Sequence, residues 1–165
     1  MAELTTLEEK LGEVIGLAMA AQAATDKVRT LAENDGADEQ VSLLERMQEE
    51  AAEAERRGTK LAATFEGKKT AILEKARETK QKGSKMMSTY LGDDADALDG
   101  FEFLTMAEAG EVGHWSVLGT LDEEFGHSGI RDLVTWGLPI QQRHLRDVQA
   151  ASLQLAAQEE PAEAS

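Results

Sequence analysis

The spacing of apolar residues constrains the fold of this chain more than any other feature of its sequence. Along four long segments these residues recur alternately four and three positions apart, as in Leu7, Leu11, Val14 and Ala18. Such a spacing places one apolar stripe along one face of an α-helix. Four stripes of this kind, with no alternating pattern typical of a strand, predict an all-α protein in which four helices bury their stripes against one another.

Signals at the ends of these segments predict the helix boundaries. Thr5 and Thr6 are each followed three residues later by glutamate, a capping-box pattern that starts the first helix. Residues 33–38 form a predicted turn in which Asp38 caps the second helix, and Ser128 is the predicted cap of the last helix. The stripes predict that the four helices end near Ala32, Phe65, Phe125 and Leu155.

The connection between the two pairs of helices is long. Residues 68–92 are predicted to be helical with a less regular stripe, and residues 91–100 to form a loop before the third main helix. Because a helix rises about 1.5 Å per residue, this connection can carry the chain back along the bundle. We therefore predict a four-helix up-down bundle of two helical hairpins joined by a long helical crossover. Residues 1–157 form the predicted domain, and residues 158–165 a disordered acidic tail.

Composition and charge exclude several classes of function. The net charge is −15, which argues against nucleic-acid binding. The absence of cysteine excludes disulfides and zinc–thiolate sites. The longest apolar run, residues 14–21, is too short to cross a membrane, and the N-terminus lacks the pattern of a signal peptide. A soluble cytoplasmic protein with no membrane or nucleic-acid partner is predicted.

One basic segment departs from the acidic character of the chain. Residues 68–85 hold seven basic and two acidic residues, a net charge of +5. Such a segment is either a solvated helix face that complements an acidic surface or a docking patch for an acidic partner. The acidic loop at 93–100 has a different interpretation. It lacks the ligand spacing of a calcium-binding loop and is predicted to cap the next helix.

Two carboxylates interrupt the stripe of the third main helix. Between Leu104 and Trp115 the three-four spacing passes through Glu108 and Glu111. Buried carboxylates need polar partners. In an antiparallel hairpin, residues equally distant from the turn lie at the same height. About Gly126 this rule places Gln141 opposite Glu111, and His144 opposite Glu108.

The first hairpin offers a similar but less regular pairing. About Gly36, Gln22 lies opposite Glu50, and Glu53 follows one turn later. Gln22 and Glu50 both lie beside the apolar stripes of their helices and not on them. The sequence therefore predicts one polar layer at mid-height, to which all four main helices contribute.

This arrangement resembles the ferritin-like four-helix bundles. Residues 108–133 resemble in particular the small stress-associated (YciF-like) ferritin-like proteins of bacteria. In the ferritin-like superfamily two helices each supply a glutamate, and two supply Glu-x-x-His, to a di-iron or di-manganese site. The resemblance implies a carboxylate and histidine site in the core of this chain.

Transferred position by position, the resemblance implies a degenerate site. Glutamine replaces glutamate at positions 22 and 141, and glutamate replaces histidine at position 53. Neutral amides bind hard divalent ions less tightly than carboxylates do. The implied iron or manganese ligands are Glu50, Glu108, Glu111 and His144, with Gln141 and Gln22 completing the set.

Two functions remain open from the sequence. The first is an oxidative-stress protein that binds iron or manganese in this site. The second is a non-catalytic ferritin-like bundle, a homodimer or higher homo-oligomer, whose metal-free polar core fixes the helix register. Pro139 adds a further expectation, because it predicts either a kink or a break in the last helix, immediately before Gln141.

Overall fold

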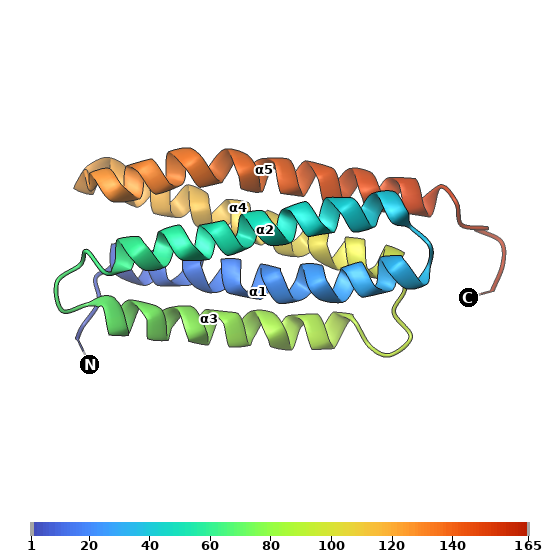
Figure 1. Cartoon of the computed structure of the whole chain (residues 1–165), viewed down its shortest axis with the longest axis horizontal. Coiled ribbons are helices and arrows are strands. Elements are labelled where there is room, and N and C mark those ends of the chain that lie inside the picture. Colours follow the sequence, from blue (N-terminus) through green and yellow to red (C-terminus); the bar gives the residue numbers. More distant parts are fainter. Residues whose placement is uncertain (1, 165) are drawn as a thin grey trace.

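The computed structural model describes residues 2–164, which form five α-helices and no strand (Figure 1). The predicted all-α class is confirmed. The helices are α1 (Thr6–Asn34), α2 (Asp38–Ala62), α3 (Lys69–Tyr90), α4 (Ala97–Phe125) and α5 (Ser128–Ala156).

The helices form an elongated bundle. Helices α1 and α2 make one antiparallel hairpin, and α4 and α5 make another (Figure 1). Helix α1 also packs against α4, and α2 against α5, so these four helices surround a common core. Helix α3 packs mainly on α1 and carries the chain from one end of the bundle back to the other. The helical crossover expected from the basic segment is therefore α3.

The caps differ from the predicted ones at two helices. The capping box of Thr5 and Glu8 is present at α1. However, the N-cap of α2 is Ala37 and not Asp38, which is the first helical residue. There its carboxylate still lies beside the positive end of the helix dipole. The N-cap of α5 is His127 and not Ser128, because the imidazole Nδ1 of His127 accepts the backbone N–H of Ile130.

Helix α4 begins earlier than predicted. Asp96 and Asp99 form a capping box, so the helix starts at Ala97 within the segment predicted to be a loop. The helix-capping role predicted for this acidic segment is confirmed. At the other end of α4, Asp122 is 3% exposed and accepts the backbone N–H of His127 at 2.7 Å. The buried carboxylate of Asp122 therefore stabilises the turn.

Helix α5 continues through Pro139 without a break. Proline has no N–H to donate to the carbonyl four residues earlier, which is that of Thr135. Two residues before the proline, Gly137 lies against the indole of Trp115. A Cβ atom at position 137 would lie 2.3 Å from Cζ3 of Trp115, so only glycine lets α4 and α5 approach this closely.

The apolar core has two parts, one towards each end of the bundle. One part gathers around Leu11, Ile15 and Trp115, and the other around Val28, Met47 and Phe101. Between them, α4 and α5 place buried polar side chains. The polar positions on the predicted stripes therefore divide the core at mid-height.

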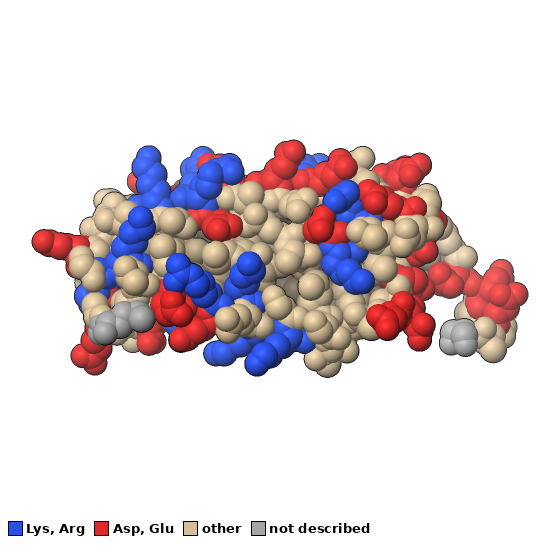
Figure 2. Space-filling view, turned by 60° about the horizontal axis from the view of Figure 1, so that its bottom comes forward, with Lys and Arg blue, Asp and Glu red and all other residues tan. Residues whose placement is uncertain are grey.

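The surface is strongly charged, and Figure 2 shows basic and acidic side chains intermixed over one face. The lysines of α3 are mostly exposed, whereas Lys68, which precedes it, forms an ion pair with Glu8 at 3.0 Å. Within residues 2–164 no helix has both the length and the apolar character needed to cross a membrane. Residues 157–164 are largely exposed and follow the end of α5, whereas Ser165 of the predicted tail lies outside the described residues.

Candidate functional site: a buried polar layer

Glu108 and Glu111 on α4 are the centre of the polar layer. Their side chains point into the core and are 1% and 4% exposed. They occupy stripe positions on the same face as Leu104 and Trp115, so the helix cannot bury its apolar residues without burying both carboxylates. Their burial follows directly from the periodicity of the sequence.

Gln141 on α5 links the two carboxylates. Its amide nitrogen donates to Oε2 of Glu108 at 3.0 Å and to Oε2 of Glu111 at 3.1 Å. This orientation of the amide is assigned from its surroundings, because the opposite one would place the amide oxygen against two acceptors. The predicted pairing of Glu111 with Gln141 across the hairpin is confirmed.

His144, one turn along α5, continues the layer. It is 2% exposed. Its Nδ1 lies 3.7 Å from Oε2 of Glu108, and its Nε2 lies 3.4 Å from Oε1 of Glu50 on α2. The imidazole therefore lies between a deeply buried carboxylate and a half-buried one. The predicted pairing of His144 with Glu108 is also confirmed.

Glu50 lies at the edge of the layer. Its carboxylate pairs with Arg143 of α5, and Arg46 lies one turn earlier on α2 with its Nε 3.8 Å away. Two guanidinium groups therefore neutralise Glu50 at the surface. The arginines were not among the predicted site residues. Arg46 had a recognisable signal, since it precedes Glu50 by four positions on one helix.

Gln22 and Glu53 are not part of the layer, and their predicted placement is wrong. The amide of Gln22 donates to the backbone carbonyl of Ala18 and to the carboxylate of Glu55. Glu53 pairs with Arg56 and Arg57. Both residues lie beside the buried stripes of their helices, where side chains reach solvent and find charged neighbours.

Helix α1 contributes no free polar group at this height. Its buried residues here are mainly alanines, and the hydroxyl of Thr25 donates to the carbonyl of Ala21 within its own helix at 2.8 Å. The layer is therefore built by α2, α4 and α5 instead of by all four main helices. Small side chains on α1 leave room beside the two glutamates.

The surroundings of Glu111 in the polar layer favour its protonated form. Burial, together with the negative charge of the neighbouring Glu108, raises the pKa of Glu111 well above its usual value of 4.5. Two buried carboxylates that share one amide donor cannot both ionise cheaply. The raised pKa favours the protonated form of Glu111, and the amide of Gln141 donates to both carboxyl groups.

The arrangement does not fit a two-ion centre. Such a centre needs about four carboxylates with histidines, whereas Glu108, Glu111 and His144 are the only acidic or imidazole side chains buried in the layer among the described residues. Over residues 2–164 no group of three or more His, Cys, Asp or Glu side chains has a geometry that could hold a metal ion. His114, the other histidine near Glu111, lies near the surface, 4.0 Å from Glu13.

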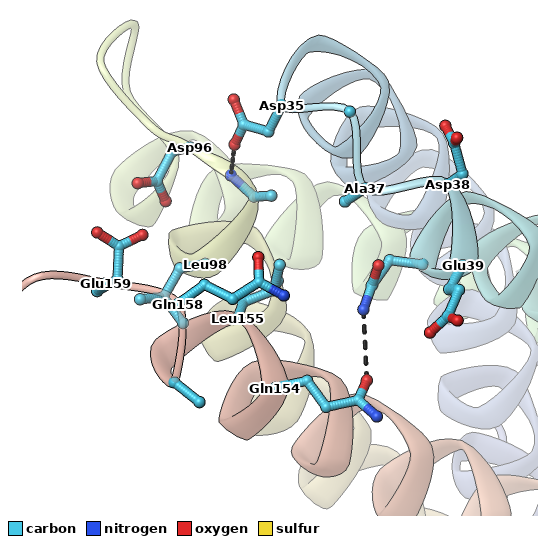
Figure 3. Close-up of a pocket in the computed structure, with 14 residues that line it drawn as sticks. Asp35, Ala37, Asp38, Glu39, Asp96, Leu98, Gln154, Leu155, Gln158 and Glu159 are labelled. Atoms are coloured by element: carbon cyan, nitrogen blue, oxygen red, sulfur yellow. Dashed lines mark hydrogen bonds between the residues drawn. The ribbon is translucent and has the colours of Figure 1, made fainter.

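A hollow lies at the end of the bundle, between the α1–α2 turn, the start of α4 and the end of α5 (Figure 3). Its volume is about 950 Å³, and several carboxylates surround it. Two of them support the fold. Asp35 accepts the backbone N–H of Ala97 at 2.8 Å, and Asp96 caps α4. On another side, Gln40 donates to Gln154 at 3.3 Å, which links α2 to α5. The polar residues around this hollow therefore have a structural role, because they join the ends of the helices.

Comparisons of the chain with protein-family models, with curated proteins and with solved structures found no significant match.

Proposed function

We propose that this chain is a non-catalytic ferritin-like bundle with a metal-free polar core, and that it acts as a dimeric structural or interaction protein. The observation that carries the proposal is that the buried carboxylates find their partners within the protein. The amide of Gln141 donates hydrogen bonds to Glu108 and Glu111, and two arginines form ion pairs with Glu50. The layer therefore needs no bound cation to compensate its charge.

In this proposal the layer determines the register of the helices. A shift of α5 by one turn along α4 would leave Glu111 without the amide of Gln141, and an unpaired buried polar group costs about 1–3 kcal/mol. An all-apolar core would penalise such a shift less. Buried polar residues that specify register are well attested in coiled coils.

The exposed face of α4 supports the dimer. Between Glu102 and Glu123 no exposed residue of this helix is charged, although the chain carries a net charge of −15. The centres of protein interfaces are depleted of charge in the same way. We propose that a second copy of the chain covers this face, whose exposed residues are Met106, Ala109, Gly110, Gly113, Val117 and Thr120.

A second candidate is a site for a single iron or manganese ion. The 3.7 Å distance between Glu108 and His144 favours it, because a carboxylate and an imidazole this close could both bind one ion. The side chains of Glu111 and Gln141 would have to reorient to complete the set. A bound ion would replace the proton of the pair and supply redox chemistry.

Elemental analysis separates the two candidates. The protein is purified from medium supplemented with iron and manganese, and a second sample is loaded anaerobically with ferrous ion. The metal-free core predicts no retained metal in either sample after gel filtration. Stoichiometric metal in the wild type that is lost in Glu108→Gln would reject the metal-free core and establish the second candidate.

A further inference from the structure

An apolar cavity of about 200 Å³ lies between α1, α3 and α4 and is bordered by the polar layer. Its walls are hydrocarbon side chains of α1 and α4, with small alanines on α1. At its rim Met86 of α3 and Met106 of α4 are 45% and 38% exposed. Methionine side chains are flexible and adapt to varied apolar ligands. The residues forming the apolar walls include Leu17, Ala21, Ala24, Phe103 and Leu104.

The charged groups of this cavity are carboxylates. Glu108 and Glu111 both line it, although each is more than nine-tenths buried. Within the described residues its other ionisable side chain is His114, and neither lysine nor arginine lines it. Burial, followed by the positive charge of Lys10, lowers the pKa of His114, so its imidazole is neutral at pH 7. None of the side chains that line the cavity is therefore positively charged at this pH.

The size of the cavity limits its ligand. A dry cavity of about 150 Å³ in another protein holds benzene. A ligand with an aromatic ring and one further carbon and nitrogen therefore suits a volume of about 200 Å³. Apolar pockets with a few convergent polar groups are the usual form of small-molecule sites.

We propose that this cavity binds a small apolar primary amine, with the hydrocarbon against α1 and the ammonium group against Glu111. This inference goes beyond the proposed structural role. Burial and the charge of Glu108 raise the pKa of Glu111, which favours its protonated form in the empty cavity. Where Glu111 is protonated before binding, its proton leaves to solvent and the carboxylate pairs with the ammonium group, so the net charge within the cavity is unchanged. The ion pair forms in an apolar surrounding, where its attraction is stronger than in water.

Isothermal titration calorimetry with benzylamine tests the proposal, with benzyl alcohol and benzoate as probes of the same shape. We expect saturable binding of benzylamine, about tenfold or more weaker binding of benzyl alcohol, and none of benzoate. Titration in two buffers of different ionisation enthalpy should reveal the released proton. Equal affinity for benzylamine and benzyl alcohol, or no binding of benzylamine, would overturn the proposal.

Variants locate the site. Ala107→Phe places a ring at the lining of the cavity and should abolish binding, whereas Ala150→Phe, at an exposed position of α5 that does not line the cavity, should leave it unchanged. Glu111→Gln should reduce benzylamine affinity about tenfold and leave benzyl alcohol unaffected. Equal loss in Ala107→Phe and Ala150→Phe would also reject the site. Metal content tests the polar core separately, so the two proposals fail independently.

Discussion

The amide nitrogen of Gln141 on α5 lies 3.1 Å from a carboxylate oxygen of Glu111 on α4, in the middle of the bundle. A neutral side chain thus stabilises an acid that has almost no access to water. Because Glu111 and Gln141 are equally distant from the turn at Gly126, the hairpin itself brings them together. Their interaction makes the contribution of the polar layer to stability measurable.

Replacing Gln141 alone should lower the stability of the protein more than replacing Gln141 and Glu111 together. Gln141→Leu deprives two buried carboxylates of their donor and should lower the free energy of unfolding by about 1–3 kcal/mol. The double variant Glu111→Leu with Gln141→Leu should be more stable than Gln141→Leu alone, because only Glu108, and not both carboxylates, then lacks the amide donor. Urea denaturation of the single and double variants measures the coupling.

The neighbouring Gln142 supplies the control for this cycle, since it is exposed on the same helix. Gln142→Leu should change stability by less than about 0.5 kcal/mol. A large loss of stability in the double variant, together with loss of bound metal, would instead support the single-ion site.

Stability should depend on pH through Glu111. Its native pKa is raised by burial and by Glu108, so the folded state binds this proton more tightly than the unfolded state. The resulting stabilisation is complete below about pH 4.5, declines as pH rises, and is lost above the native pKa. We expect the stability of the wild type relative to Glu111→Gln to fall across this window.

Urea denaturation at a series of pH values measures this difference. Glu8 and Glu13 have lowered pKa values, so their contributions are lost as pH falls below the usual range of a carboxyl group. In both residues burial raises the pKa, but other interactions outweigh it. At Glu8 these are hydrogen bonds from Thr5 and Lys68 and the charge of Lys68, and at Glu13 chiefly the hydrogen bond and charge of Lys10. Both proteins share these groups, so their effects cancel. A difference that stays constant across the window would show that Glu111 ionises normally in the folded protein.

Gly137 should tolerate no side chain. In Gly137→Ala the new methyl group would overlap the indole ring of Trp115, whose nearest atoms lie 2.3 and 2.4 Å from the place that the Cβ would take. We expect a loss of about 1–3 kcal/mol from overpacking. Gly110→Ala on α4 is the matched control, because its Cβ would meet nothing within 4 Å. It should gain about 1 kcal/mol from helix propensity. Thermal denaturation of both variants gives the comparison.

The dimer should depend on the uncharged face of α4. Val117 lies within this face and is 45% exposed, so Val117→Glu would place a charge in the proposed interface. Sedimentation velocity should find a dimer for the wild type and a monomer for this variant. Leu153→Glu, at a site 66% exposed on α5, should leave the dimer intact. A wild-type protein that is monomeric at high micromolar concentration would contradict the proposed dimer.

Much of the candidate site could be predicted from residue spacing. The burial of Glu108 and Glu111 follows from the stripe of α4, and their pairing with Gln141 and His144 follows from the short turn to α5. The placement of Gln22 failed because it lies beside its stripe. A rotation of the helix by a fraction of a turn then decides whether such a side chain faces the core or the solvent.

The sequence by itself determined the helices, their buried faces and the heights of residues within each hairpin. These are local properties, set by a period of about 3.6 residues and by turns too short to allow a large shift. Only the tertiary structure decided that Glu50 of α2 pairs with Arg143 of α5, and that α1, α3 and α4 enclose an apolar cavity beside Glu111. Those relationships join segments distant in the chain, and they depend on how side chains of every helix pack together.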